Sequence, residues 1–241
     1  MEFMVNRRLS GVSTLRALCV ACLLQAFAFF MVPASAESND ADAAQNYIVD
    51  RDASLIRIYV YRAGLLNFLG HDHLISTRLI NGGLNYAPPP SADDEFKLTV
   101  PVDALVVDDP EQRKSAGGKF ARPVTAEARA GTRRNMLSGK VLDAAHYPEI
   151  TVTGHWLGGS PSHGDVALTV ELRGQRRDFT APVDLQAQNG RLLVTGTLHL
   201  LQSEIGITPL SIMGGTLKVA DAVDIRFALA FVPAAERPPP H

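Results

Sequence analysis

The segment VALTVELRGQRRDFTAPVDLQAQNGRLLVTGTLHL, residues 166–200, decides the fold because its apolar residues recur at every second position. In residues 166–172, Val or Leu stands at each even position and a small or polar residue at each odd one. Residues 179–186 repeat the pattern. A period of two is typical of strands that bury one face. Arg173-Gly174-Gln175 and Asn189-Gly190 separate the apolar runs, and Asn-Gly strongly favours a two-residue hairpin.

The same alternation extends to both sides of this segment and predicts eight strands. In chain order they are expected near residues 54–62, 72–86, 94–107, 149–157, 164–173, 176–188, 191–203 and 218–232. Several exceed ten residues, and long antiparallel strands joined by short turns suit a closed barrel, which leaves no sheet edge exposed. We therefore expect an all-β, eight-stranded antiparallel barrel, with a flat sandwich as the alternative.

One charged, Gly-rich stretch, residues 108–140, interrupts the strand pattern. A helix is expected from about Pro123 to Leu137, because proline suits a first helical turn and Gly139 suits the end. Residues Ala63–Phe68 allow a second short helix. The fold thus includes one or two short helices, the longer lying across an end or flank of the barrel.

The first 36 residues have the form of a signal peptide. A positive region contains Arg7, Arg8 and Arg16, an apolar run covers residues 17–32, and Ala34-Ser35-Ala36 provides a cleavage pattern. The run is shorter than the roughly 20 residues that span a bilayer. We expect cleavage after Ala36 and a periplasmic or secreted mature protein; an uncleaved anchor is the alternative.

Composition narrows the function. The chain has 23 basic and 25 acidic residues, and three Arg but one Glu lie in the leader, so the mature part is mildly acidic. This argues against a nucleic-acid partner. Both cysteines, Cys19 and Cys22, also lie in the leader, which excludes thiol catalysis, cysteine-ligated metal and a disulfide scaffold. The polar start, residues 37–46, and the Pro-rich tail, residues 233–241, are expected to be mobile.

The interior of an eight-stranded barrel either fills with side chains or holds one small ligand. Patterning alone favours a filled core, although Gly154 and Gly196 fall within strands, where glycine leaves space or lets the sheet bend. If a ligand is enclosed, the inward apolar residues are its expected contacts. These are Ile58, Val60, Trp156, Leu168, Val170, Phe179, Val183, Leu198, Phe227 and Leu229.

Ordered short motifs then identify a family resemblance. They include Tyr47-Ile-Val-Asp50, Leu142-Asp143, Tyr147-Pro-Glu-Ile150 and Ala220-Asp-Ala-Val-Asp-Ile225. In this order they resemble the YceI-like, lipid- or polyisoprenoid-binding family of exported bacterial proteins, over about residues 47–232. The segment Leu-Asp-x-x-x-Tyr-Pro-Glu-Ile is the most specific part.

The resemblance implies an extended lipocalin-like barrel with a hydrophobic tunnel. Its implied partner is a long-chain hydrophobic molecule, a polyisoprenoid, quinone or fatty chain, with its polar head at the mouth. It implies no catalysis and no cofactor other than a bound polyprenyl lipid or quinone. We further expect transient membrane contact for ligand exchange and consider a homodimer. A structural barrel with a filled core is an alternative.

The segment Leu69-Gly-His-Asp-His73 departs from the family pattern. On a strand His71 and His73 share one face, a spacing that suits zinc, copper or nickel. The alternative function is thus a metal-binding protein or metalloenzyme, with His146 or His163 as a third ligand. The pair could instead hydrogen-bond loop backbone or contact a ligand head group.

A basic group on the expected helix offers a second head-group contact. Arg129 and Arg133 are four apart and share a helix face, with Arg134 and Lys140 nearby. Arginine recognises phosphate and carboxylate well, so Arg133 and Arg134 are head-group candidates, and a solvated helix surface is the alternative. The sequence contains no Gly-x-Ser-x-Gly motif, which would have indicated a serine nucleophile.

Overall fold

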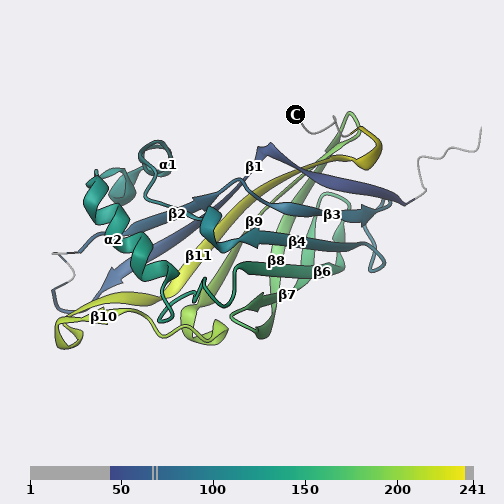
Figure 1. The fold of residues 1–241 in the computed structure, drawn as a ribbon. Coiled ribbons are helices and arrows are strands. Elements are labelled where there is room, and N and C mark those ends of the chain that lie inside the picture. The colour runs from purple at the N-terminus through teal and green to yellow at the C-terminus, as the bar shows by residue number, and fades with distance from the viewer. Residues whose placement is uncertain (1–43, 67, 69, 237–241) are drawn as a thin grey trace, which may run out of the picture. The chain divides into compact units, whose positions relative to one another are not determined.

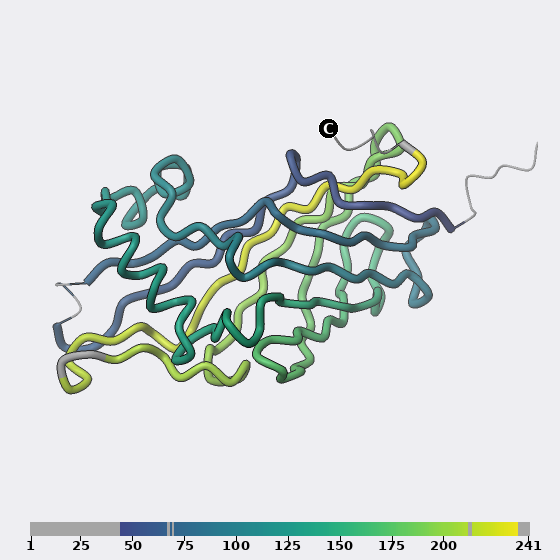
Figure 2. The backbone as a smooth tube through the Cα atoms, viewed as in Figure 1, coloured from purple at the N-terminus to yellow at the C-terminus, as the bar shows by residue number. Residues whose placement is uncertain are grey.

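Eight antiparallel strands close into a barrel in the computed structural model, which describes residues 44–66, 68 and 70–236 (Figure 1). The smooth backbone trace shows the same ring of strands (Figure 2). This confirms the expected fold class. Around the ring the strands are β1 (Gln45–Ala63), β11 (Leu217–Pro233), β9 (Arg191–Leu201), β8 (Gln175–Gln188), β7 (His163–Leu172), β6 (Glu149–Ser160), β4 (Glu95–Pro101) and β3 (Asn81–Tyr86), which returns to β1.

Both ends of the chain differ in part from expectation. Gln45 and Asn46 were expected in a mobile start, but they are the first residues of β1 and pair with β3. Pro233, expected in the tail, pairs with Tyr47 as the last residue of β11. The proposed signal peptide, residues 1–36, lies outside the described residues and stays a prediction. No helix of the described part is long and apolar enough to span a membrane.

β1 has two successive neighbours on one side. Its start pairs with β3, and its second half pairs with β2 (His73–Thr77), which in turn pairs with β5 (Val106–Val107). The expected strand 72–86 is therefore two strands, and so is 94–107, which the 3-10 turn η3 (Val102–Ala104) divides. Strands β2 and β5 extend the wall where β3 ends.

The break between β2 and β3 has a visible cause. A bulge shifts the register of β1 against β11 between Asp50 and Leu55. The Arg78 guanidinium, directly after β2, donates hydrogen bonds to the carbonyls of Asp52 and Ser54 in that bulge, at 3.0 and 2.9 Å. Residue 78 is thereby held across the bulge, and the chain turns to begin β3.

The longer helix, α2 (Ala126–Leu137), begins later than expected. Thr125 caps it, and its hydroxyl oxygen accepts a hydrogen bond from the Ala128 amide at 3.2 Å. A side-chain acceptor at this position satisfies an amide that the first helical turn leaves unpaired. Pro123 consequently lies before the helix rather than within its first turn.

The second helix lies elsewhere than expected. Residues 63–66 form no α-helix: Ala63 is the last residue of β1, and Gly64 bends the chain at a φ of +89°. The helix is α1 (Pro110–Ala116), capped by the Asp109 carboxylate, which accepts from the Gln112 amide. The remaining short elements are η4 (Gly118–Ala121), η5 (Gln202–Ile205), β10 (Ser211–Ile212), η6 (Met213–Gly215) and η7 (Ala234–Glu236).

Glycines inside the barrel make room for aromatic rings. Phe96 pairs with Gly154 and Phe227 pairs with Gly196 across neighbouring strands. A Cβ added at Gly154 would lie 2.6 Å from the Phe96 ring, and one at Gly196 would lie 2.5 Å from the Phe227 ring. Each of these glycines therefore leaves room for a phenyl ring against the sheet, so the space expected as one of two alternatives at these positions is filled by an aromatic ring.

Candidate functional site

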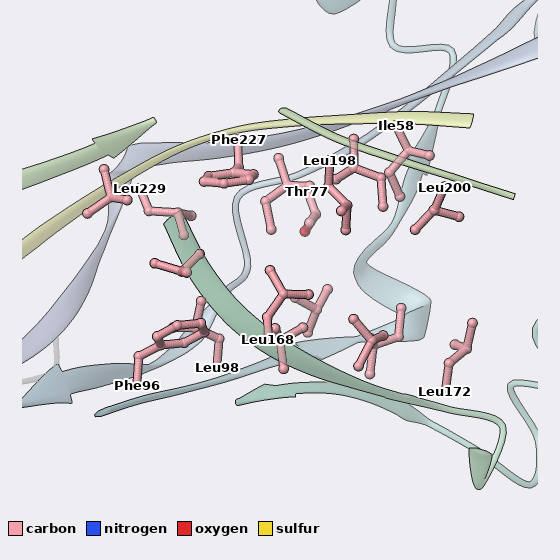
Figure 3. Close-up of a pocket in the computed structure, with 18 of the residues that line it drawn as sticks. Ile58, Thr77, Phe96, Leu98, Leu168, Leu172, Leu198, Leu200, Phe227 and Leu229 are labelled. Atoms are coloured by element: carbon pink, nitrogen blue, oxygen red, sulfur yellow. The ribbon is translucent and has the colours of Figure 1, made fainter. Parts of the chain in front are cut away.

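An apolar cavity of about 310 Å³ lies inside the barrel (Figure 3). This volume is at the lower end of the range typical of small-molecule sites. Every strand of the ring contributes side chains to its wall, as do β2, α2 and the segments around Leu105, Leu142 and Ile207. The interior is thus not completely filled by its own residues.

The alternation of residues along the strands determines which side chains face the cavity. On β7 these are the even-numbered residues 166–172, and on β11 the odd-numbered residues 223–231. The intervening positions, such as Asp224 and Arg226, carry polar side chains on the outer face. The pattern that predicted the strands therefore also builds an almost wholly apolar wall.

Three of the few polar side chains on the wall are hydrogen-bonded to the protein's own backbone. The Thr77 hydroxyl accepts from the Leu79 amide at 3.1 Å, and the Gln202 amide donates to the Ala220 carbonyl at 2.7 Å. The Asp94 carboxylate accepts from two backbone amides in the β3–β4 connection. Because these three side chains are already bonded and most of the wall is apolar, the cavity suits a ligand that fits by apolarity and shape.

Nine of the ten predicted contact residues lie on the cavity wall. Phe179 is the exception: it is half-buried against the cluster that contains Leu168 and Leu198 and is not a wall residue. A period of two identifies the inward face but not which inward residues border empty space. Those on the wall are Ile58, Val60, Trp156, Leu168, Val170, Val183, Leu198, Phe227 and Leu229.

Sequence reasoning missed the wall residues that lie outside long strands. They come from the β4–β5 connection, the end of α2 and the segments after α2 and β9, none of which shows strand periodicity. An amphipathic period in α2 could have found only one of them. They are Leu105, Met136, Val141, Leu142, Ile205 and Ile207.

The two histidines are not at the cavity. His71 is exposed, and neither His71 nor His73 is a wall residue. The ring of His73 lies with Nδ1 2.6 Å from an oxygen of Asp108, whose carboxylate also accepts from the Leu74 amide and the Arg113 guanidinium. His73 thus belongs to a polar cluster beside β2, and its expected role at the mouth is not supported.

The Asp108 carboxylate is the centre of that cluster and is fully buried. Burial raises the pKa of this carboxyl, but hydrogen bonds with His73 and Leu74 and charge interactions with His73 and Arg113 lower it, and the pKa ends below its ordinary value. The side chain is therefore an anion held by donors on three sides, which ties β2 to α1.

The expected metal site does not assemble in the described residues. His146 contacts Asp143 at 2.9 Å and His163 contacts Asp184 at 2.7 Å, and neither joins the His71–His73 pair. Within these described ranges, no group of three His, Cys, Asp or Glu residues is placed to hold a metal ion. Of the two head-group arginines, Arg134 is exposed and borders neither pocket, whereas Arg133 borders a smaller pocket beside α2.

Comparisons with known proteins agree with this geometry. A family model described as the YceI-like domain matches residues 47–231. No curated protein matches the chain. The structure is similar to that of Burkholderia cenocepacia BcnA, with 14% identity and a TM-score of 0.55 over 76% of this chain and 98% of that one.

A second similar structure is a polyisoprenoid binding domain from Saccharophagus degradans, described as implicated in plant cell wall breakdown. It has 14% identity and a TM-score of 0.52 over 78% of this chain and 98% of that one. At such identities the likeness shows a shared fold.

Proposed function

The chain belongs to the YceI-like family, and from this premise we propose that it is a non-catalytic protein that encloses one long apolar chain in its barrel. The observation that carries the proposal is the cavity, whose wall is almost wholly apolar and whose charged residues, Asp94 and Glu95, lie together at one end. A polyisoprenoid, a quinone tail or a fatty chain has the matching chemistry. The similar domain from Saccharophagus degradans is described as polyisoprenoid binding.

Burial of the chain supplies the affinity. Each methylene removed from water contributes roughly 0.8 kcal/mol, so about ten supply roughly 8 kcal/mol. Loss of translational and rotational freedom on binding costs an estimated 4–15 kcal/mol. About ten carbons therefore offset only the lower part of that cost, and longer apolar chains should bind more tightly. With the expected leader removed, we propose that such a ligand is bound outside the cytoplasm.

Native mass spectrometry of protein purified from a membrane-containing extract tests this function. We expect a complex heavier than the polypeptide by the mass of one isoprenoid, quinone or fatty chain, and we expect organic extraction to release that molecule. Recovery of the bare polypeptide alone, with no extractable lipid, contradicts the proposal. Membrane contact during exchange and homodimer formation stay predictions.

A further inference from the structure

A second pocket, of about 190 Å³, lies between α2 and the connection from β4 to β5. Its wall contains Asp103, Leu105, Val106, Val107, Arg129, Ala130 and Arg133. Leu105 also belongs to the wall of the large cavity, so a single side chain borders both spaces. The small pocket therefore adjoins the large cavity, and its wall includes two arginines and an aspartate.

Arg133, which borders this pocket, carries a donor without a partner among the described residues. One terminal nitrogen, Nη2, donates to the Asp103 carbonyl at 2.8 Å. The other, Nη1, is buried, and among the described residues it has no hydrogen-bond partner. A buried charged donor without an acceptor is costly, because it has lost its contacts with water and gained none in return. An acceptor supplied by a ligand would remove that cost.

The pocket also holds more positive charge than its surroundings neutralise. Arg129, one helical turn before Arg133, donates only to the Val124 carbonyl at 3.2 Å. Asp103 borders the pocket, but no carboxylate in the described part of the chain forms an ion pair with either arginine. By contrast, the buried Arg113 is neutralised by Asp108. Two guanidiniums thus border the same small pocket without a carboxylate partner among the described residues, an arrangement that favours binding of an anion.

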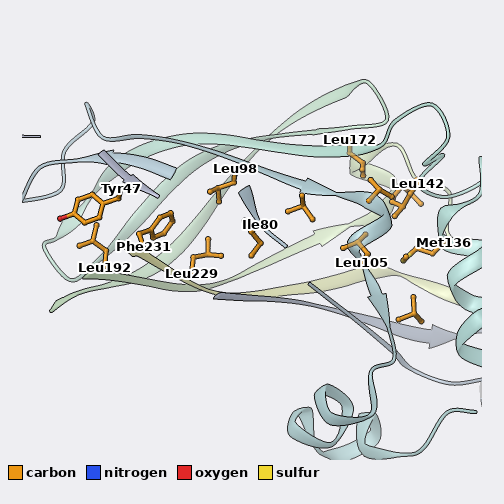
Figure 4. Close-up of a cluster of buried hydrophobic side chains, with 14 of the residues drawn as sticks. Tyr47, Ile80, Leu98, Leu105, Met136, Leu142, Leu172, Leu192, Leu229 and Phe231 are labelled. Carbon is orange, nitrogen blue, oxygen red and sulfur yellow. The ribbon is translucent and has the colours of Figure 1, made fainter. Parts of the chain in front are cut away.

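The large cavity carries negative charge at the end away from the small pocket. The charged residues of its wall are Asp94 and Glu95, in the β3–β4 region next to Tyr86, which packs against Tyr47. Tyr47 lies at the end of the core cluster opposite Leu105 and Met136 (Figure 4). An acidic head is therefore repelled from the Asp94 end and attracted toward the arginine end.

We propose that the pocket between α2 and β5 is a binding site for an oxyanion, a carboxylate or phosphate, held by Arg133 and Arg129. Guanidiniums bind both groups through paired, charge-assisted hydrogen bonds. The adjoining cavity favours one source, the head group of a chain ligand whose tail lies in the barrel. This assignment rests on the proposed function and narrows it to acidic amphiphiles.

The test is calorimetric titration of the full mature chain with dodecyl phosphate, dodecanol and inorganic phosphate, the amphiphiles below their micelle concentrations. We expect dodecyl phosphate to bind about tenfold to a hundredfold more tightly than dodecanol, since hydrogen bonds to charged groups contribute about 1.5–3 kcal/mol. Arg133→Gln should abolish that difference, and Arg133→Lys should restore part of it. Arg134→Gln, which removes the same charge from an exposed neighbour on the same helix, should preserve it.

The outcomes separate the two proposals. Binding of both amphiphiles with equal affinity, together with no binding of inorganic phosphate, overturns the oxyanion site and leaves the carrier function intact. Failure of both amphiphiles to bind overturns the carrier function. Inorganic phosphate that binds wild type but not Arg133→Gln, without any gain for dodecyl phosphate over dodecanol, supports the oxyanion site with a free ion as its source. If Arg134→Gln loses as much as Arg133→Gln, general surface charge explains the preference and the site is refuted. Thermal unfolding of each variant confirms that it is folded.

Discussion

Leu168→Trp should block the cavity without disrupting the barrel. Leu168 lies on β7, is 7% exposed and is a residue of the cavity wall, across the cavity from Leu198 and Thr77 (Figure 3). An indole at this position occupies space that a ligand chain otherwise fills. If it displaces about three methylenes, binding loses roughly 2.4 kcal/mol, which is about a fiftyfold increase in Kd.

The same substitution distinguishes a cavity from a filled core. In a filled core the larger side chain costs about 1–3 kcal/mol of stability through overpacking. In the barrel the indole enters empty space, so we expect the free energy of unfolding in urea to change by less than about 1 kcal/mol. Leu168→Trp should therefore weaken ligand binding strongly while changing the free energy of unfolding little.

The assay is dodecanol displacement of a bound fluorescent fatty-chain probe. Thr180→Trp is the matched control, because Thr180 lies exposed on the outer face of β8 and the change adds the same ring there. The control should bind dodecanol as wild type does. Unchanged Kd in Leu168→Trp, with the protein folded, would refute the placement of the ligand in the cavity.

Asp108→Asn leaves the buried Arg113 without its counter-charge, and we expect a loss of about 3–5 kcal/mol in urea unfolding at neutral pH. The pKa of Asp108 is lowered in the folded state, so ionised Asp108 stabilises the fold above the ordinary aspartate pKa of about 3.9, and this stabilisation is lost as the pH falls toward the folded-state pKa. The difference in unfolding free energy between wild type and Asp108→Asn should therefore become smaller in acid. A difference that is small, or that does not change with pH, is the contrary result. Gly196→Ala should cost about 1–3 kcal/mol in thermal unfolding, since its Cβ would lie 2.5 Å from the Phe227 ring and 2.7 Å from a backbone oxygen. Gly131→Ala, in α2, places the added carbon 3.8 Å from Arg134 Nη2, an ordinary contact, and should instead stabilise by up to about 1 kcal/mol. Equal effects at the two glycines would contradict the role given to Gly196.

Strand periodicity predicted the barrel and its inward face well, because one burial pattern repeats along every long strand. It could not predict where strands break. The division after β2 depends on Arg78 reaching carbonyls in the β1 bulge, about 25 residues earlier in the chain. Likewise, α1 begins at a cap formed by one carboxylate, Asp109, whose neighbours showed no helical period.

The site was less predictable than the fold. The spacing of His71 and His73 suggested a metal, but Asp108, 35 residues beyond His73, binds that ring and gives it a structural partner. Whether the interior is empty depends on how side chains from all strands fill it together, as the seating of Phe96 on Gly154 shows. Single-strand patterns carry no information on such packing.

A crystal structure of the protein grown with 12-bromododecanol tests the central claim most directly, because bromine is located by its anomalous scattering. The account predicts a bromine peak and a continuous chain inside the barrel, against Ile58, Leu168 and Leu198. A chain bound only on the outer surface, with wall side chains closing the cavity, would contradict it.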